Sequence, residues 1–341
     1  MQAWKLNQDG KIALEKIEAV SPSEGFIKVK VGYSLVSYMD VKMFEGKITP
    51  TRRPITIGHH AVGMVSEVSE GAGSVARGDR VVIDPFICCD LCDDSKDRDA
   101  KCSECTDLKM YGLHEDGLMS DFAVVRADDV YKLPERIKDE DAVFTPHVAF
   151  AVNIINKLQL DKGEHLVIVG ATVVGIMLAQ LALYYQAIPI LVDTREERLN
   201  IAENLGVYYC INSVKEDVKK KIFTLTGGSM ASAITYFPTG DNIISKCFNY
   251  ASTGGRVCIG DWSGEQKDLS GSFNAVLSKQ LSVFGVNNGA KLIPAAINML
   301  ANKTVSVAGM VSSTVAFKDV DKALVEESAH PNKNIKILVK V

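Results

Sequence analysis

The stretch Val167-Ile168-Val169-Gly170-Ala171-Thr172-Val173-Val174-Gly175 joins two apolar runs through a turn bounded by glycines. Apolar runs of this kind are typical of buried parallel strands, and glycine permits a tight turn into a following helix. The helix N-terminus carries partial positive charge and exposed N–H groups, which suit a pyrophosphate. The stretch therefore predicts the first strand, turn and helix of a dinucleotide-binding sheet.

Strand and helix patterns alternate on both sides of this turn, over residues 149–287. The predicted strands are 166–169, 189–192, 208–211, 233–237 and 257–259, and the predicted helices are 176–185, 195–205 and 242–250. Strands that alternate with helices predict a parallel sheet covered by helices on both faces.

The chain before residue 149 has a different pattern. Residues 26–31 and 61–68 alternate apolar and polar side chains, which is typical of half-buried strands. The C-terminal part predicts helices at 292–300 and 319–327 and a strand at 335–341. A chain of 341 residues with two such patterns predicts two domains.

The composition excludes several classes of protein. The net charge is −4, and no run of Lys and Arg with interleaved aromatics would neutralise nucleic-acid phosphates. Residues 166–192 carry no charge, but glycine, glutamine and proline interrupt them, so they fit strand, turn, helix and strand better than a membrane span. The N-terminus lacks the apolar run of a secretory signal, so we expect a cytoplasmic protein without membrane partners.

The predicted turn has one substitution that affects the cofactor. Thr172 stands where the fingerprint has its middle glycine, so we expect weakened binding or a hydroxyl contact to phosphate. Asp193 ends the next strand and suits the ribose hydroxyls of NAD, whereas nearby Arg195 leaves NADP open. The predicted cofactor-binding residues are Gly170, Thr172, Val174, Gly175, Asp193 and Arg198.

Four paired cysteines, Cys89, Cys92, Cys102 and Cys105, predict a structural zinc site. Two Cys-x-x-Cys pairs offer four thiolates for a tetrahedral ion, and their use as ligands is typical of a reducing compartment. The alternative is a set of unmetallated surface thiols. Cys88 is then a bystander, and we expect the remaining cysteines in the core, namely Cys210, Cys247 and Cys258.

A second glycine-punctuated stretch reads Gly58-His59-His60-Ala61-Val62-Gly63, followed by Gly78-Asp79-Arg80-Val81 and the cysteine pairs. This order of motifs resembles the medium-chain dehydrogenase/reductase family, the zinc alcohol and polyol dehydrogenases. The resemblance implies an α/β fold, with a doubly wound Rossmann domain and a mostly β, GroES-like catalytic domain. It implies boundaries at 1–148, with a zinc lobe at about 85–112, at 149–287, and at 288–341, which returns to the catalytic domain.

The resemblance also locates the positions of a catalytic zinc, and here this chain differs from the family. The cysteine ligand corresponds to Ser37 and the third ligand to Thr145, whereas His59 is retained and is followed by His60. A neutral hydroxyl is a poor substitute for thiolate, so we expect the ordinary catalytic zinc to be lost. The proton-relay positions have become Met39 and Lys42, and Asp40 remains to support His59.

Three routes then stay open for the chemistry. Three imidazoles could bind a rearranged metal, or they could donate protons and hydrogen bonds without metal, or the reaction could be conjugate reduction of an activated alkene. The predicted catalytic residues are Ser37, Tyr38, His59, His60 and His147, in a cleft between the domains facing the nicotinamide. His114, His165 and His330 are expected to be structural or at the surface.

We therefore expect an NAD(H)-dependent oxidoreductase, nearest to the polyol, sugar-phosphate and threonine dehydrogenases, acting on a small molecule with its structural zinc kept. The alternatives are a zinc-dependent alcohol or polyol dehydrogenase with histidine replacement ligands, and a non-catalytic dinucleotide-binding protein. Family resemblance also implies a homo-oligomer, a dimer or tetramer, through the edge near residues 282–286.

Overall fold

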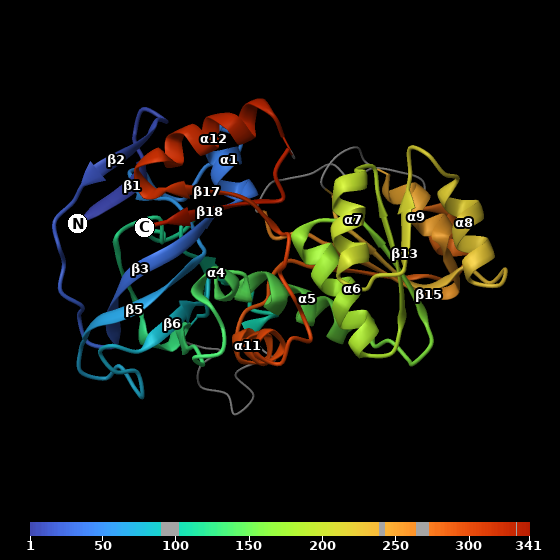
Figure 1. The fold of residues 1–341 in the computed structure, drawn as a ribbon, viewed down its shortest axis with the longest axis horizontal. Coiled ribbons are helices and arrows are strands. Elements are labelled where there is room, and N and C mark those ends of the chain that lie inside the picture. The colour runs from blue at the N-terminus through green and yellow to red at the C-terminus, as the bar shows by residue number, and fades with distance from the viewer. Residues whose placement is uncertain (90–101, 239–242, 264–272, 332) are drawn as a thin grey trace. The chain divides into compact units, whose positions relative to one another are not determined.

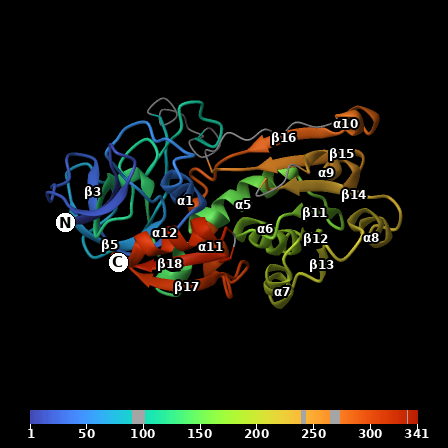
Figure 2. The same cartoon turned by 90° about the horizontal axis from the view of Figure 1, so that it is seen from above.

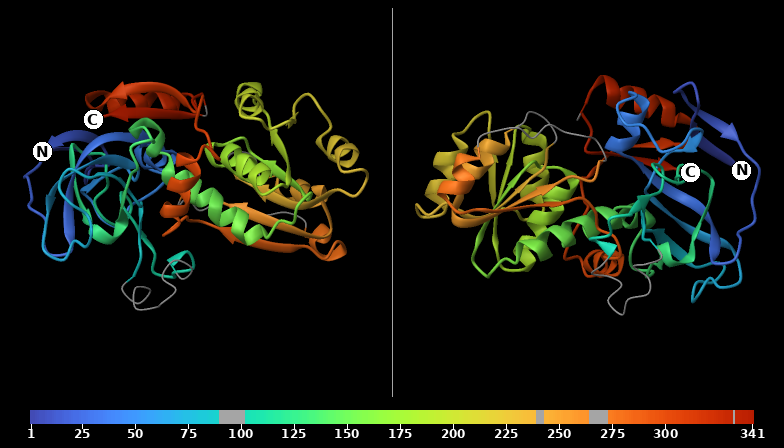
Figure 3. Two further views of the ribbon diagram at one scale, coloured as in Figure 1. Left: turned by 60° about the horizontal axis from the view of Figure 1, so that its bottom comes forward. Right: turned by 180° about the vertical axis from the view of Figure 1, so that it is seen from behind.

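The structure is a computed structural model, and it describes residues 1–89, 102–238, 243–263, 273–331 and 333–341. The chain forms two compact units. The first contains Met1–Ala149, Gly289–Ala301 and Val311–Val341, and the second contains Phe150–Asn288 and Asn302–Met310. Residues 302–310 therefore pack with the second unit, although the returning C-terminal tail was expected to join the first. Both termini lie in the first unit (Figure 3).

The first unit is mostly β. Its strands are β1 (Gln2–Leu6), β2 (Ile12–Lys16), β3 (Phe26–Val36), β4 (Ile55–Thr56), β5 (Ala61–Val68), β6 (Arg80–Ile83), β7 (Phe86–Ile87), β8 (Lys109–Met110), β9 (Phe122–Arg126), β10 (Val130–Lys132), β17 (Val311–Ala316) and β18 (Lys336–Lys340). The largest sheet has the order β10-β6-β5-β3-β18-β17, with β9 also paired to β3. Strands β2, β1 and β4 form a second sheet, and β7 pairs with β8.

Strand β3 is the centre of this unit. Its alternation buries Ile27, Val29 and Val31 in a core with side chains of β5, β6 and β9. Gly63 on β5 crosses β3 so closely that a Cβ there would lie 2.1 Å from the Lys30 carbonyl oxygen. The C-terminal strand β18 pairs antiparallel with the far end of β3, so the end of the chain completes the sheet that its N-terminal part begins (Figure 1).

Short helices complete the first unit. They are α1 (Tyr38–Phe44), η1 (Ala127–Asp129), α4 (Asp139–Ala142), α11 (Ile293–Ala301), η2 (Phe317–Asp319) and α12 (Val320–Ala329). Helix α5 (Thr145–Leu158) begins in the first unit and continues into the second.

The second unit is a parallel α/β sheet, which confirms the predicted fold class. Its elements are β11 (His165–Val169), α6 (Val173–Tyr184), β12 (Ile188–Asp193), α7 (Glu196–Asn204), β13 (Tyr209–Asn212), α8 (Val218–Leu225), β14 (Ala231–Tyr236), α9 (Ile244–Tyr250), β15 (Ala251–Gly260), α10 (Asn274–Ser278) and β16 (Ser282–Val286). All five strand pairs are parallel, in the order β13-β12-β11-β14-β15-β16 (Figure 2).

The strand order reverses between β11 and β14, so the turn after β11 lies at the topological switch point where open α/β sheets bind ligands. The uncharged segment 166–192 forms β11, α6 and most of β12, as predicted. Among the residues that the structure describes, no helix is long and apolar enough to cross a membrane.

A buried ion network anchors the second segment of the first unit to its β-sheet. The Lys291 ammonium lies 3.3 Å from Asp129 Oδ1 and donates to the Asp128 carbonyl at 2.8 Å, and the Lys291 amide donates to Asp84 Oδ2. Tyr111 donates its hydroxyl to Asp129 Oδ2 at 3.1 Å. Asp84 and Asp129 are fully buried, and burial raises the pKa of both carboxyls, that of Asp84 to about 7.

We predict that Lys291→Met destabilises the first unit by about 3–5 kcal/mol, because it leaves the buried Asp129 carboxylate without its cation. Urea unfolding followed by a probe in the first unit measures this difference. Lys322→Met is the matched control, since Lys322 pairs with Asp319 at the surface with its side chain 77% exposed. Equal midpoints for the two variants would show that the buried pair contributes nothing.

Candidate active site

Asp40 joins helix α1 to the turn that carries His59. Ser37 caps α1, with its amide and hydroxyl donating to Asp40 Oδ2 at 2.9 and 2.6 Å, while the Asp40 amide donates back to Ser37 Oγ. Asp40 Oδ1 accepts a hydrogen bond of 3.0 Å from the Gly58 amide. Burial raises the pKa of Asp40, and its hydrogen bonds from Ser37 and Gly58 oppose that shift. The predicted supporting role of Asp40 thus has a structural basis.

The predicted histidines come together in the first unit. The rings of His59 and His60 have centroids 4.1 Å apart, and His60 stacks on His147 at 4.5 Å with an angle of 10° between the ring planes. Their side chains come from the turn before β5 and from the start of α5. His59 and His147 are each 3% exposed, and His60, whose ring lies against both, is fully buried.

Burial keeps all three imidazoles neutral. It lowers the pKa of His59 to about 3, and it lowers the pKa values of His60 and His147 well below their ordinary range. The Lys336 ammonium, at the first position of β18, adds to each of these shifts. Lys336 directly precedes Ile337, the partner of Val36 in the β3–β18 ladder, which places it beside the Ser37 end of β3.

The two hydroxyls at the former ligand positions are engaged elsewhere. Ser37 donates to Asp40, and Thr145, which is fully buried, donates to the Ala142 carbonyl at 2.6 Å. The ring nitrogens of two stacked rings direct their lone pairs within two nearly parallel, separated planes, so His60 and His147 cannot both point their lone pairs at one ion. Within the described part of the chain, no group of three or more His, Cys, Asp or Glu side chains is arranged to hold a metal. The residues at these positions do not fit a catalytic zinc.

Two further side chains lie on helix α1. Tyr38 is 40% exposed, and the Lys42 ammonium lies 5.0 Å from its ring centroid. Lys42 also pairs with Glu45 at 2.8 Å. Met39 is buried, so the position that relays a proton in the family holds a core side chain. Of the predicted catalytic residues, only Tyr38 is well exposed.

The dinucleotide turn shows how threonine replaces glycine. Thr172 is the N-cap of α6, and its Oγ1 accepts a hydrogen bond of 3.0 Å from the Gly175 amide. Gly170 has a φ of 113°, and a Cβ on Gly175 would lie 2.1 Å from the Gly170 carbonyl oxygen. Both glycines are therefore required by the backbone, whereas Thr172 folds its side chain back onto the helix.

Asp193 holds the turn from the neighbouring strand. Its Oδ2 accepts from the Ala171 amide at 2.7 Å, and its Oδ1 accepts from the Arg195 amide and Nε at 2.9 and 3.2 Å. Although burial acts to raise the pKa of Asp193, Arg195 and the amide contacts hold it below its ordinary value. Arg198 and Val174, also predicted to bind cofactor, are 7% and 5% exposed. The sequence did not predict the ion pair between Asp193 and Arg195.

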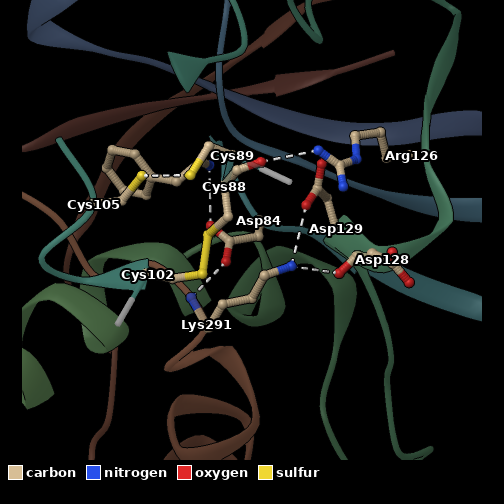
Figure 4. The surroundings of a disulfide bond; sticks show 10 residues. Asp84, Cys88, Cys89, Cys102, Cys105, Arg126, Asp128, Asp129 and Lys291 are labelled. Atoms are coloured by element: carbon tan, nitrogen blue, oxygen red, sulfur yellow. Dashed lines mark hydrogen bonds and ion pairs between the residues drawn. A yellow bond between two sulfur atoms is a disulfide. The ribbon is translucent and has the colours of Figure 1, made fainter. Parts of the chain in front are cut away.

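The cysteine lobe differs from the predicted ligand set. Cys102 forms a disulfide with Cys88, which was expected to be a bystander, whereas Cys89 and Cys105 have their sulfurs 3.4 Å apart (Figure 4). Cys92 lies outside the described residues. A disulfide sulfur is not a thiolate, so the prediction of Cys102 as a zinc ligand applies to the reduced lobe. The reason is geometric: the end of β7 brings Cys88 to the start of the segment that carries Cys102.

The remaining cysteines are in the second unit. Cys247 and Cys258 are fully buried, as expected, and Cys210 is partly buried. Burial raises the pKa of each of these thiols to about 12.

Comparisons with known proteins extend over the whole chain. Residues 23–135 match the model of the alcohol dehydrogenase GroES-like domain, and residues 173–302 match that of the zinc-binding dehydrogenase. An uncharacterised zinc-type alcohol dehydrogenase-like protein of Haemophilus influenzae is 28% identical over 338 residues, covering 99% of this chain and 98% of its own.

Two further relatives were found. A sorbitol dehydrogenase of Halalkalibacterium halodurans is 26% identical over 326 residues, with 92% of each chain covered. A crystal structure of an Escherichia coli alcohol dehydrogenase, RspB, complexed with NADH, has a TM-score of 0.88 at 24% identity, covering 100% of this chain and 99% of that one.

We predict that the three imidazoles stay neutral between pH 5 and 8, as measured by NMR of histidine labelled in its ring. The unfolded chain in denaturant is the control, because its histidines titrate near about 6.5. The unfolded state then binds more protons, so stability falls as pH drops below about 6.5, by up to about 1.4 kcal/mol per pH unit for each histidine. A midpoint near 6.5 for any of the three in the folded protein would contradict their burial as neutral groups.

Proposed function

Since the chain belongs to the medium-chain dehydrogenase/reductase family of zinc-type alcohol dehydrogenases, whose members are NAD(P)-dependent oxidoreductases, we propose that it transfers hydride between NAD(H) and a small alcohol, carbonyl or activated alkene. The observation that carries this proposal is the turn at the switch point of the sheet. Gly170, Thr172 and Gly175 build the helix N-terminus there, and Asp193 holds it from the next strand.

The residues of this turn fit a dinucleotide. Bound NAD supplies the hydride acceptor, and NADH the donor. The N-terminus of α6 presents backbone N–H groups and a partial positive charge to a pyrophosphate. The Thr172 hydroxyl accepts from Gly175, which leaves its own proton for donation to a phosphate oxygen. Asp193 suits the ribose hydroxyls, and its negative charge disfavours a 2′-phosphate, so we propose NAD over NADP.

Arg195 keeps NADP open as a second cofactor. Its guanidinium pairs with Asp193 Oδ1 at 3.2 Å and offsets part of the carboxylate charge. A 2′-phosphate would therefore meet less repulsion than beside an isolated carboxylate, and Arg195 could turn to contact it.

We propose that the chemistry proceeds without a catalytic zinc. A zinc ion supplies several kcal/mol of stabilisation to a developing alkoxide. In this chain, neutral imidazoles provide hydrogen-bond donors, and a neutral imidazole can polarise a carbonyl. His59 and His147, each 3% exposed, are the proposed hydrogen-bond donors, and Tyr38 is a further donor. His60, which stacks on His147, and Ser37, which bonds Asp40, are positioning residues. A conjugate reduction needs less stabilisation, because an enolate spreads its charge.

The alternative of a zinc enzyme with histidine ligands has one supporting observation, the clustering of three imidazoles. The parallel stacking of His60 on His147 argues against it. Lys336 beside the cluster also disfavours a divalent cation.

We further propose that the cysteine lobe binds a structural zinc through Cys89, Cys92, Cys102 and Cys105 when all four are reduced. The chemistry of the donor set fits, because two of these sulfurs, those of Cys89 and Cys105, lie 3.4 Å apart.

We also propose a cytoplasmic homo-oligomer. Strand β16 ends the parallel sheet and leaves Ser282, Val283 and Gly285 exposed, so a second copy could pair with it.

We predict about one zinc ion per chain in protein purified under reducing conditions, because only the lobe offers a thiolate set. Elemental analysis measures the ratio, and diffraction at the zinc edge locates the ion. Two ions per chain, with one at His59, would favour the zinc-dependent alternative.

We also predict that the protein binds NADH. A titration with NADH, monitored by fluorescence, measures this binding. No binding at millimolar NADH would reject the proposed function.

We also predict that His59→Ala and His147→Ala each lower kcat/KM by about 10²-fold or more, because each removes a proposed hydrogen-bond donor. The assay uses NAD with sorbitol and a panel of short polyols, and NADH with the corresponding ketones. His165→Ala is the control, since His165 lies at the start of β11 and has no proposed role. If both variants keep the rate of the His165 variant while still binding NADH, the imidazoles are structural.

A further inference from the structure

Lys28 is a buried lysine on the outer face of strand β3. Its neighbours Ile27 and Val29 point into the core, and side chains alternate along a strand, so Lys28 lies on the opposite face. The residue is nevertheless only 7% exposed. Its ammonium lies 2.9 Å from Glu67 Oε1 and 5.8 Å from the centroid of the Phe122 ring. A charge buried in this way marks a covered position on the outer face of the sheet.

A β-bulge shapes the neighbouring strand β5 at this point. Glu67 pairs with Lys28 and Val65 pairs with Val29, so Ser66 is an additional residue between the two pairs. The Ser66 hydroxyl donates to the Lys28 carbonyl at 3.0 Å. Bulges interrupt a ladder and redirect the side chains around them, and here the Glu67 carboxylate reaches the Lys28 ammonium.

Two cavities, of about 550 and 690 Å³, lie along this face. Both are lined by Ser66, Glu67 and Arg77, so they form one continuous groove. Lys28 and Phe122 line the smaller cavity. Each volume lies within the range of small-molecule sites. The apolar side chains of the larger cavity are Pro22, Val68, Val75 and Ala76.

Arg77 is the cation that the groove leaves available. It lies on the turn before β6, where the Ala76 amide donates to Asp79 Oδ2 at 2.7 Å and the Gly78 amide donates to the Val65 carbonyl at 2.9 Å. Arg77 is exposed, and among the residues that the structure describes its guanidinium has no hydrogen-bond or ion-pair partner. A turn held by hydrogen bonds thus presents an uncompensated positive charge to both cavities.

The charged groups in the walls of the groove favour an anion. They include three cations, namely the Met1 ammonium, Lys28 and Arg77, and two carboxylates, those of Glu67 and Asp121. Three positive charges against two negative charges leave one positive charge. A ligand with a single negative charge would therefore balance the groove.

We propose that this groove binds a small organic monocarboxylate with an apolar body. The planar guanidinium of Arg77 pairs with the carboxylate through two parallel hydrogen bonds. The apolar body packs against the side chains of the larger cavity.

This site is separate from the candidate active site in the same unit. Lys28 lies near the start of β3 and Ser37 follows its end, and the strand rises by roughly 30 Å between them. The groove therefore goes beyond the proposed dehydrogenase reaction, and its occupancy can be measured without an activity assay.

The test uses the full chain and 3-(4-bromophenyl)propionate as the probe, with binding measured by isothermal titration calorimetry. We expect binding that Arg77→Gln weakens by about tenfold or more, because the variant loses a charge-assisted pair of hydrogen bonds. Arg136→Gln is the matched control, since Arg136 is an exposed arginine that lines neither cavity, and it should bind as the wild type does. Equal affinities of Arg77→Gln and wild type, or no binding at millimolar probe, would overturn the proposal.

Three further measurements identify what the groove recognises. Diffraction at the bromine edge from a soaked crystal should place the bromine beside Val68 and Val75, and a single peak elsewhere would reject the site. The uncharged analogue 3-(4-bromophenyl)propanol should bind about tenfold more weakly or less, and equal binding would reject carboxylate recognition. Inorganic phosphate that binds as tightly as the probe would indicate an adventitious ion only. Displacement of the probe by NADH would assign it to the proposed cofactor site and reject the groove.

Discussion

The buried carboxylate of Asp40 is the constraint on which the candidate active site depends. It is fully buried and accepts hydrogen bonds from the Ser37 amide, the Ser37 hydroxyl and the Gly58 amide. Burial of a carboxylate is costly unless such donors surround it. Because the donors come from the start of α1 and from the turn before β5, one side chain fixes the distance between these elements. The position of His59 follows directly from that bond.

The same side chain also explains why Ser37 is poorly suited to replace a cysteine ligand. The Ser37 hydroxyl donates a hydrogen bond of 2.6 Å to the Asp40 carboxylate. Thr145 likewise donates a hydrogen bond to the Ala142 carbonyl. Both substitutions thus convert a ligand position into part of the local hydrogen-bond network. What remains is a set of neutral imidazoles with an ammonium nearby, an environment that favours an electron-rich oxygen more than a cation.

The fold and part of the site could be predicted because they depend on local patterns. Apolar runs fixed the parallel strands, although helix α6 begins at Val173 rather than 176, since Thr172 caps it. Strand β15 begins at Ala251, well before the predicted residue 257, because it pairs with β14 through a register shift that spans the glycine pair. Other features depend on contacts between distant residues. Nothing local indicates that His60 stacks on His147, or that residues 302–310 pack with the second unit.

In the cysteine lobe too, the sequence did not predict a contact, here the pairing of the cysteines. Spacing identified which residues could act together, but several pairings of cysteines are compatible with one spacing. The choice between them is made by the backbone: β7 pairs with β8, Arg126 holds the Cys88 carbonyl, and Cys88 is thereby brought to Cys102.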